Sequence, residues 1–347
     1  MSLTTQDFTF VRELVRTEMG LVLDESKQYL VETRLRPVVR ARGLRDLGDL
    51  IGAARKGDTL VQGEVLAAMA TNETSFFRDG HPWVTLREHL LPQLASARAG
   101  ARTLRIWSAA CSTGQEPYTL ALLIAEDLPQ LRSWHIDILA TDLSEPVLER
   151  ARNGVFSDLE VRRGLPTKLR DRWFHRQAGG WQIDPALRAM VRFQHMNLVQ
   201  PWPSLPTFDL VLMRNVLIYF DIPTKQRILR QVRTKLAPDG ALMLGASEST
   251  LNIDDRFTLE HLGRSVAYRP QGAPAAVNGH DTGTRPADGT RPAAGTRPAG
   301  AAAGSSGSAA GRSSAAARPA SADRPSGAAR PASPTRPSPP RHAPHRR

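Results

Sequence analysis

The sequence predicts an α/β protein in which a small all-α N-terminal domain precedes a doubly wound, mostly parallel sheet. Apolar residues recur at helical spacing before residue 70, strand and helix patterns alternate from Leu104 to Arg269, and residues 271–347 consist mainly of Ala, Pro, Gly, Ser and Arg. Alternation favours parallel strands joined by crossover helices. A tail with so few large apolar residues cannot bury enough surface to fold, so we expect it to be disordered.

We therefore expect four parts along the chain. They are a helical domain at 1–70, a linker with a lead-in helix at 71–103, the sheet domain at 104–270 and the disordered tail at 271–347. Residues 154–190 interrupt the strand and helix alternation. They contain a hairpin pattern around a Gly-rich turn at Gln177–Gly180, which predicts a small inserted antiparallel β subdomain.

The net charge of +12 is unevenly distributed. The tail carries eleven Arg and three Asp, which leaves only +4 for residues 1–270 and does not indicate specific nucleic-acid binding. The tail could contact acidic surfaces, or it could serve only as a solubilising or tethering segment. Cys111 is the only cysteine, which excludes an intramolecular disulfide and a cysteine-rich metal cluster. With neither a signal-peptide pattern nor an apolar run near ~18 residues, we expect a cytoplasmic protein.

Three helices are expected within residues 7–70, because apolar residues recur there three and four positions apart. Asp24 or Ser26 could cap the second helix, and Gly43 could end it. The residues that define the helices are Phe10, Val11, Leu14 and Val15, then Leu30, Val31, Leu35 and Val38, then Val61, Val65, Leu66 and Met69.

From residue 104 onward, apolar runs predict strands and three proline-initiated segments predict helices. The main strands are expected at Leu104–Ser108, Ile136–Thr141, Val191–His195, Phe208–Met213 and Ala241–Gly245. The helices are expected at about Pro117–Leu128, Pro146–Asn153 and Pro223–Leu236. Arg256–Glu260 and Arg264–Arg269 could form a terminal pair of strands.

The turn after the first strand carries the most specific signal. Residues 106–117 read I-W-S-A-A-C-S-T-G-Q-E-P, a strand end, a run of small residues and a helix start at Glu116. Small residues let a ligand approach the backbone closely. The turn has neither the G-x-G-x-x-G pattern nor a P-loop lysine, so it favours a nucleotide-type cofactor without phosphates. The alternative is a plain strand-to-helix connection.

Two further strand ends carry candidate ligand-binding residues. Asp142 follows the second strand, where an acid can accept hydrogen bonds from both ribose hydroxyls of a nucleoside, or can cap the next helix. Asn197 and Leu198 follow the third, where the amide can pair with an adenine edge and the leucine can cover its face. An Asn after a strand is also a common turn residue.

Two more segments complete the candidate site. In F-D-L-V-L-M-R-N-V-L-I-Y-F, residues 208–220, Asn215 and the Val216 backbone should lie beside the first turn. Tyr219 could face either the pocket or the core, and Phe220 is expected in the core. In T-N-E-T-S-F-F-R-D, residues 71–79, the polar side chains could bind a ligand or form a capping box in the linker. The ligand-binding candidates there are Asn72, Thr74 and Arg78.

Together these motifs resemble the CheR-type chemotaxis receptor methyltransferases, which are S-adenosylmethionine-dependent protein-glutamate O-methyltransferases. The resemblance covers about residues 5–270 and implies a Rossmann-like class I methyltransferase sheet that uses S-adenosylmethionine and no metal. Arg78 and Tyr219 are the catalytic candidates, because the Arg78 guanidinium could also steer an incoming carboxylate and Tyr219 could face the pocket. The cofactor-binding residues that the resemblance implies are Asn72, Thr74, Arg78, Glu116, Asp142, Asn197, Leu198, Asn215 and Val216.

The expected function is methylation of chemoreceptor glutamates to 5-O-methyl esters for sensory adaptation. The alternatives are a cofactor-binding regulatory or scaffold module without turnover, and a related carboxyl methyltransferase that acts on another protein. We expect a monomer. Members of the family that dock on a receptor's C-terminal pentapeptide tend to have a longer loop than the hairpin turn Gln177–Gly180, so we expect no dependence on such a tether. A basic cluster is the candidate docking surface for the receptor helical bundle, with an ordinary solvated face as the alternative. It comprises Arg34, Arg36, Arg40, Arg42 and Arg45.

Overall fold

The computed structural model describes residues 3–271 of the chain. The disorder expected for the tail at 271–347 therefore concerns residues that, from 272 onward, lie outside the described part. Within the described part, no helix is both long and apolar enough to cross a membrane.

The N-terminal region, among the described residues up to Met69, is built from helices and connecting loops. Its helices are α1 (Thr5–Met19), α2 (Gln28–Ala41), α3 (Leu47–Arg55) and α4 (Thr59–Met69). Each turns an apolar face to a shared core that includes Val11, Leu35, Ile51 and Val65. The sequence predicted three helices there, and α3 is an addition. It begins at the Asp46 cap, whose side chain accepts from the Asp49 N–H, and is only nine residues long.

Of the two predicted boundaries of the second helix, the start is altered and the end is as predicted. Asp24 accepts from the Ser26 N–H and caps a short 3₁₀ turn, Glu25–Lys27, that leads into α2. The cap thus belongs to this turn and α2 itself has no side-chain cap. Gly43 follows α2 with φ +65°, a left-handed conformation that ends the helix as predicted.

The main sheet has seven strands in the order β6-β2-β1-β7-β8-β10-β9. Pairing is parallel from β6 through β8, whereas β10 is antiparallel to both β8 and β9. The strands are β1 (Thr103–Ala109), β2 (His135–Asp142), β6 (Val191–His195), β7 (Phe208–Met213), β8 (Leu236–Leu244), β9 (Phe257–Leu262) and β10 (Ser265–Pro270). All five predicted main strands and the terminal pair are therefore confirmed, with β8 starting earlier than expected, directly after α12 (Ile222–Lys235).

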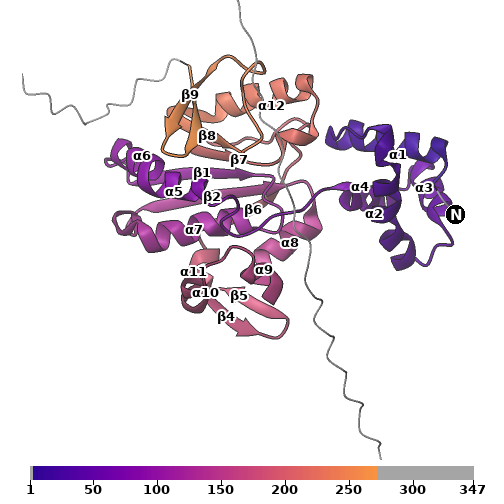
Figure 1. Ribbon diagram of the computed structural model, residues 1–347, viewed down its shortest axis with the longest axis horizontal. Helices are drawn as coiled ribbons and strands as arrows, with labels where there is room; N and C mark the ends of the chain where they lie inside the picture. Colours follow the sequence, from indigo (N-terminus) through magenta and orange to yellow (C-terminus); the bar gives the residue numbers. More distant parts are fainter. Residues whose placement is uncertain (1–2, 272–347) are drawn as a thin grey trace, which may run out of the picture. The chain divides into compact units, whose positions relative to one another are not determined.

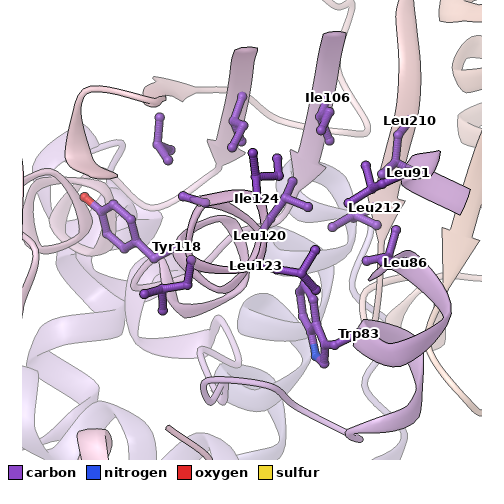
Figure 2. Packing of buried hydrophobic residues seen from close by; sticks show 14 of the residues in the cluster. Trp83, Leu86, Leu91, Ile106, Tyr118, Leu120, Leu123, Ile124, Leu210 and Leu212 are labelled. Atoms are coloured by element: carbon purple, nitrogen blue, oxygen red, sulfur yellow. The ribbon is translucent and has the colours of Figure 1, made fainter. Parts of the chain in front are cut away.

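Helices cover both faces of this sheet, as Figure 1 shows for α7 (Gln115–Asp127) and α12. Alternate side chains of each strand enter different cores, because successive strand residues point to opposite faces. In β1, Ile106 joins the core beneath α7, and Trp107 joins the core beneath α12. Figure 2 shows Leu120 and Ile124 of α7 packed toward Ile106 and its neighbours. Burial on both faces explains the continuous apolar pattern of these strands.

A lead-in segment and an inserted subdomain flank the sheet. The lead-in runs through α5 (His81–Thr85), a π turn at Leu86–Leu90 and α6 (Leu91–Ala97). The insertion follows α8 (Glu145–Asn153) and contains an antiparallel sheet in the order β3-β5-β4, with the short helices α9 (Asp158–Arg162), α10 (Thr167–Trp173) and α11 (Pro185–Arg188).

The predicted hairpin comprises β4 (Phe174–Gln177) and β5 (Gly180–Ile183), joined by the two residues Ala178 and Gly179. The third strand, β3 (Val155–Phe156), is too short to stand out in the sequence. Gly180 has φ +143°, and a Cβ there would lie 2.2 Å from the Phe156 carbonyl oxygen. Only glycine therefore lets β3 approach β5 at this point.

Candidate functional site

One cavity lies at the carboxyl ends of β1, β2 and β7, where ligands bind in doubly wound sheets. Met19 and Leu21 of the N-terminal helical region contribute to its wall. Every residue that the sequence and the resemblance nominated for cofactor binding or catalysis lines this cavity: Asn72, Thr74, Arg78, Glu116, Asp142, Asn197, Leu198, Asn215, Val216 and Tyr219.

The turn after β1 wraps closely around one end of the cavity. Ala110 and Ser112 both have positive φ, +57° and +51°, and Gly114 follows at +93°. The Cys111 N–H donates to the Thr141 carbonyl, 2.9 Å away, which fixes the turn to the end of β2. A Cβ on Gly114 would lie 3.0 Å from the Ala151 side chain, so the close approach of α8 also favours glycine.

The Asp142 carboxylate accepts two backbone hydrogen bonds, although α8 itself has no side-chain cap. Its Oδ1 accepts from the Ser144 N–H at 3.0 Å, just before α8, and its Oδ2 accepts from the Ser112 N–H at 2.8 Å. Burial raises the pKa of this carboxyl, and the hydrogen bonds from Ser144 and Ser112 oppose that rise. Because each carboxylate oxygen can accept more than one bond, Asp142 organises the turn and still presents acceptors to the cavity.

Glu116 lies in the first turn of α7 and faces the same cavity. Its Oε1 accepts from the Ser108 hydroxyl at 2.9 Å, and its Oε2 accepts from Arg214 Nη1 at 3.1 Å. Burial raises the pKa of Glu116, and the positive charge of Arg214 is the largest opposing influence.

Arg214 was not predicted, although it directly follows β7 and precedes Asn215. Its side chain is 2% exposed. Besides Glu116, its Nη2 donates to Asp79 Oδ2 at 2.6 Å and to the Arg78 carbonyl at 3.1 Å. Its guanidinium carbon lies 5.5 Å from the centre of the Trp83 ring, within range of a cation–π contact.

A second residue missed from the sequence, Glu248, holds the loop after β7. Its carboxylate accepts from the N–H groups of Asn215 and Gly245, each at 2.7 Å, and from that of Ile218 at 3.2 Å. Asn215 has φ +59°, so the carboxylate stabilises a residue held in a left-handed conformation. The signal that could have pointed to Glu248 was its position in A-S-E, four residues past the end of β8.

The end of this loop lies against the N-terminal helical region. The Val22 N–H donates to the Tyr219 carbonyl at 3.1 Å, and Leu21 forms an isolated antiparallel bridge with Phe220. Tyr219 is half-buried, lines the cavity and also packs against the helical core. Phe220 was expected purely in the core. It is half-buried and lines the cavity as well, because the bridge to Leu21 holds it at the cavity wall.

The segment 71–79 forms another wall of the cavity. The Ser112 hydroxyl donates to the Asn72 carbonyl at 2.9 Å, and Arg78 Nη1 donates to the Glu73 carbonyl at 2.7 Å. The alternative of a capping box in the linker is wrong, because α5 begins later, after Gly80, and has no side-chain cap. The Thr71 hydroxyl instead accepts from Arg34 Nη2.

Asn197 has its amide engaged in the structure. Its Oδ1 accepts from the Val199 N–H at 3.0 Å, as the turn alternative predicted, and its Nδ2 donates to the Glu18 carbonyl at 2.6 Å. Leu198 is buried in the core beneath α12 and presents part of its surface to the cavity.

The predicted basic cluster divides into two groups. Arg34 turns inward, and its Nη1 donates to the carbonyls of Met69 and Ala70 at the end of α4. Its guanidinium therefore holds α4 and the following segment against α2 and is not part of an open surface. The other four arginines are exposed, and three of them pair with acids of the same region: Arg36 with Glu32, Arg42 with Glu64 and Arg45 with Asp49.

Backbone strain gathers around the cavity. Seven non-glycine residues of the described chain have positive φ, and three of them, Ala110, Ser112 and Asn215, line the cavity. Phe77 and Asp79, on either side of Arg78, also belong to this set. Such conformations cost about 1–3 kcal/mol each and concentrate at functional sites.

The polar groups that line the cavity fit a nucleoside that carries an amino acid. Two buried carboxylates, Glu116 and Asp142, supply acceptors suited to hydroxyl and ammonium donors, and half-buried Asn72 adds an amide. Leu198 and Val216 supply apolar surface for a flat ring.

Comparison with known proteins follows the same division of the chain. Residues 6–68 match the all-alpha domain of CheR methyltransferases, and residues 72–266 match their SAM binding domain. The chain is 40% identical over 274 residues to chemotaxis protein methyltransferase 1 of Pseudomonas aeruginosa, covering 78% of this chain and 99% of that protein. It is 33% identical to the chemotaxis protein methyltransferase of Escherichia coli, covering 75% and 90%. The protein therefore belongs to the CheR methyltransferase family.

Proposed function

We propose that this protein transfers the methyl group of S-adenosylmethionine to glutamate side chains of chemoreceptors, producing glutamate 5-O-methyl esters. The observation that carries the proposal is that the ten candidate residues, which come from five separate segments, line a single cavity. The names of the relatives support chemotaxis as the setting, and the buried acceptors support a nucleoside cofactor that carries an amino acid.

In this proposal the carboxylates mark the two ends of the cofactor. Asp142 accepts from the ribose hydroxyls, as acids at the end of the second strand do in this architecture. Glu116 and the segment that contains Asn72 and Thr74 bind the polar amino-acid end. Asn197 and Leu198 border the adenine, with the Asn197 backbone available where its amide is already engaged.

The bound cofactor supplies a methyl group activated by a sulfonium charge. A glutamate carboxylate is a nucleophile at neutral pH, so the protein needs no strong base. Its task is to align the carboxylate with the methyl group, and positioning of this kind lowers barriers substantially. Arg78 would steer the incoming carboxylate by a charge-assisted hydrogen bond, and Tyr219 would border its path.

The receptor bundle would dock on the exposed part of the basic cluster, which comprises Arg36, Arg40, Arg42 and Arg45. Arg40 has no ion-pair partner among the described residues, so its charge is the most available. The two-residue turn of the β4–β5 hairpin supports docking without a C-terminal pentapeptide tether.

Charge reversal tests this docking surface. Arg40→Glu should raise KM for receptor-bearing membranes, since it replaces attraction to an acidic bundle with repulsion, and leave cofactor affinity unchanged. Arg162→Glu, on the exposed surface of the inserted subdomain, is the matched control. Equal KM values for the two variants and the wild type would remove the cluster from the proposal.

The function itself is tested by transfer of labelled methyl groups to membranes that contain chemoreceptors. The proposed activity predicts label that base releases as methanol, and receptors whose methyl-accepting glutamates are replaced by alanine should not be labelled. Asp142→Asn should reduce transfer at least about tenfold by weakening cofactor binding. Cofactor binding without any transfer would instead indicate a regulatory module, and label in other proteins alone would indicate a different carboxyl substrate.

A further inference from the structure

Arg214 joins two parts of the cavity that come from different regions of the chain. Glu116 belongs to α7, whereas Asp79 and the Arg78 carbonyl belong to the lead-in segment. One guanidinium contacts all three, through Nη1 on one side and Nη2 on the other. Glu116 lies on the cofactor side of the proposed reaction, and Arg78 lies on the carboxylate side.

We propose that Arg214 is a positioning residue that holds Arg78 and Glu116 in the relative position that methyl transfer requires. The inference rests on the proposed function, because it assigns Arg214 to the alignment of the two reaction partners. Arg214 acts through its neighbours. Its Nη2 holds the backbone carbonyl of Arg78, and its Nη1 fixes the orientation of the Glu116 carboxylate.

Arg214 is buried between the two cavity walls that it joins. Its side chain is 2% exposed, and its Nε is buried without a hydrogen-bond partner among the described residues. An unpaired buried donor costs stability. Arg188 and Arg233, which do not line the cavity, also bury an Nε without a partner among the described residues. The assignment of Arg214 therefore rests on its contacts with Glu116, Asp79 and the Arg78 carbonyl, which join two walls of the cavity.

The segment that Arg214 holds is otherwise strained. Phe77 and Asp79 have φ of +49° and +69°, and Arg78 lies between them. The Trp83 indole also donates to the Arg78 carbonyl at 3.0 Å, so this oxygen accepts two bonds from buried donors. A residue between two left-handed neighbours needs such contacts to hold one orientation.

Three variants separate charge from geometry. Arg214→Lys keeps a positive charge beside Glu116, but an ammonium cannot reproduce the planar two-sided fork. Arg214→Gln removes the charge. Arg98→Gln is the matched control, because Arg98 also bridges two carboxylates and lies far from the cavity lining. Each variant is titrated with S-adenosylhomocysteine by calorimetry, and kcat is measured on receptor-bearing membranes at saturating cofactor.

We expect Arg214→Gln to raise the Kd for S-adenosylhomocysteine at least about tenfold, because Glu116 loses its cation. Arg214→Lys should keep Kd within about threefold of wild type and still lose kcat about tenfold or more, since misalignment alone slows positioned reactions. Arg98→Gln should melt earlier, with Kd and kcat unchanged.

Wild-type Kd and kcat in both Arg214 variants would overturn the inference, as would equal losses in Arg98→Gln. Should Arg214→Gln fail to fold, Arg214→Lys decides alone, and a lysine variant with wild-type kcat contradicts the assignment. If the wild-type protein binds S-adenosylhomocysteine and methylates receptors while the Arg214 variants contradict the inference, only the assignment of Arg214 is wrong and the proposed function stands. A wild-type protein that gives no heat overturns the proposed function and this inference with it.

Discussion

The two ends of β7 each carry an arginine–carboxylate cluster, partly exposed at the amino end and centred on buried Arg214 at the carboxyl end. The clusters differ in how completely their hydrogen-bonding groups are satisfied. At the amino end, Arg98 donates to Asp209 at 2.6 Å and to both oxygens of Asp239 at 2.7 and 2.5 Å. Asp209 also accepts from the Arg105 N–H. At the carboxyl end, the Nε of Arg214 lacks a partner among the described residues, and the neighbouring backbone is left-handed at several positions.

We interpret this difference as separating a structural cluster from the cluster at the candidate site. Burying charges is costly unless hydrogen bonds satisfy them, and the amino-end cluster meets that condition. The carboxyl-end cluster retains an unsatisfied donor and strained residues, a combination that folding alone does not favour. The same strand thus carries a stabilising ion-pair cluster at one end and a candidate reaction site at the other.

The largest expected effect on stability comes from the amino-end cluster. Asp209→Asn should lower the free energy of unfolding by about 3 kcal/mol, because it leaves Arg98 partly uncompensated. Urea denaturation followed by circular dichroism measures the change. Asp255→Asn, an exposed control, should stay within about 0.5 kcal/mol of wild type. Loss of S-adenosylhomocysteine affinity in folded Asp209→Asn would contradict the separation of the two ends.

A smaller stability effect, with a functional consequence, is expected from Glu248→Gln. The amide cannot accept from all three backbone N–H groups of the loop, so unfolding should become easier by about 1–2 kcal/mol. Because the loop contains Asn215 and Val216, the Kd for S-adenosylhomocysteine should rise about tenfold. Glu260→Gln, which removes one ion pair with Arg269, is the control and should leave Kd unchanged. A stability loss without any change in Kd would leave Glu248 a structural residue only.

On acidification, cofactor affinity at the carboxyl end of β7 should be lost before the stability that comes from the amino-end cluster. Arg98 lowers the pKa of Asp239 below its ordinary 3.8, so the stability from that pair is complete above 3.8 and is lost only as pH falls below it. Burial raises the pKa of Glu116 above 4.5, which favours its protonated form in the folded protein. Cofactor affinity, which needs the ionised form, should therefore decline while folding is still intact. Calorimetry and thermal melts between about pH 8 and pH 5 compare the two, and a Tm that falls before the affinity does would contradict this order.

The smallest expected effect concerns backbone strain in the turn after β1. Ala110→Gly should stabilise the protein by about 0.5 kcal/mol, because glycine adopts φ of +57° without strain but loses more entropy on folding. The looser turn should bind S-adenosylhomocysteine about threefold more weakly. Arg102→Gly, at a left-handed residue before β1 and thus at the opposite edge, should change stability without changing Kd. A destabilised Ala110→Gly would show that the turn stores no strain.

The sequence predicted the sheet and the position of the site because both depend on local patterns. Strands buried on both faces are continuous apolar runs, and parallel strands bring their carboxyl ends to one edge. The proximity of Asp142 and Glu116 could therefore be predicted from the sequence alone. The short elements α3 and β3 were missed because nine and two residues carry too little periodicity.

Residues whose function depends on distant contacts could not be found in this way. Arg214 reaches Asp79, 135 positions earlier, and Glu248 binds the Asn215 backbone, 33 positions earlier. Arg34 was grouped with its basic neighbours, since nothing local shows that it turns toward the end of α4. In each case the packing of separate elements decides the partner, and composition does not reveal it.

The most direct test of the central claim is a crystal structure of the protein grown with S-adenosylhomocysteine. We expect continuous density for the nucleoside at the carboxyl ends of β1, β2 and β7, with the ribose against Asp142 and the amino-acid end near Glu116. Density for the nucleoside at another place on the protein, or a cavity without it at saturating concentration, would contradict the assignment of this edge of the sheet.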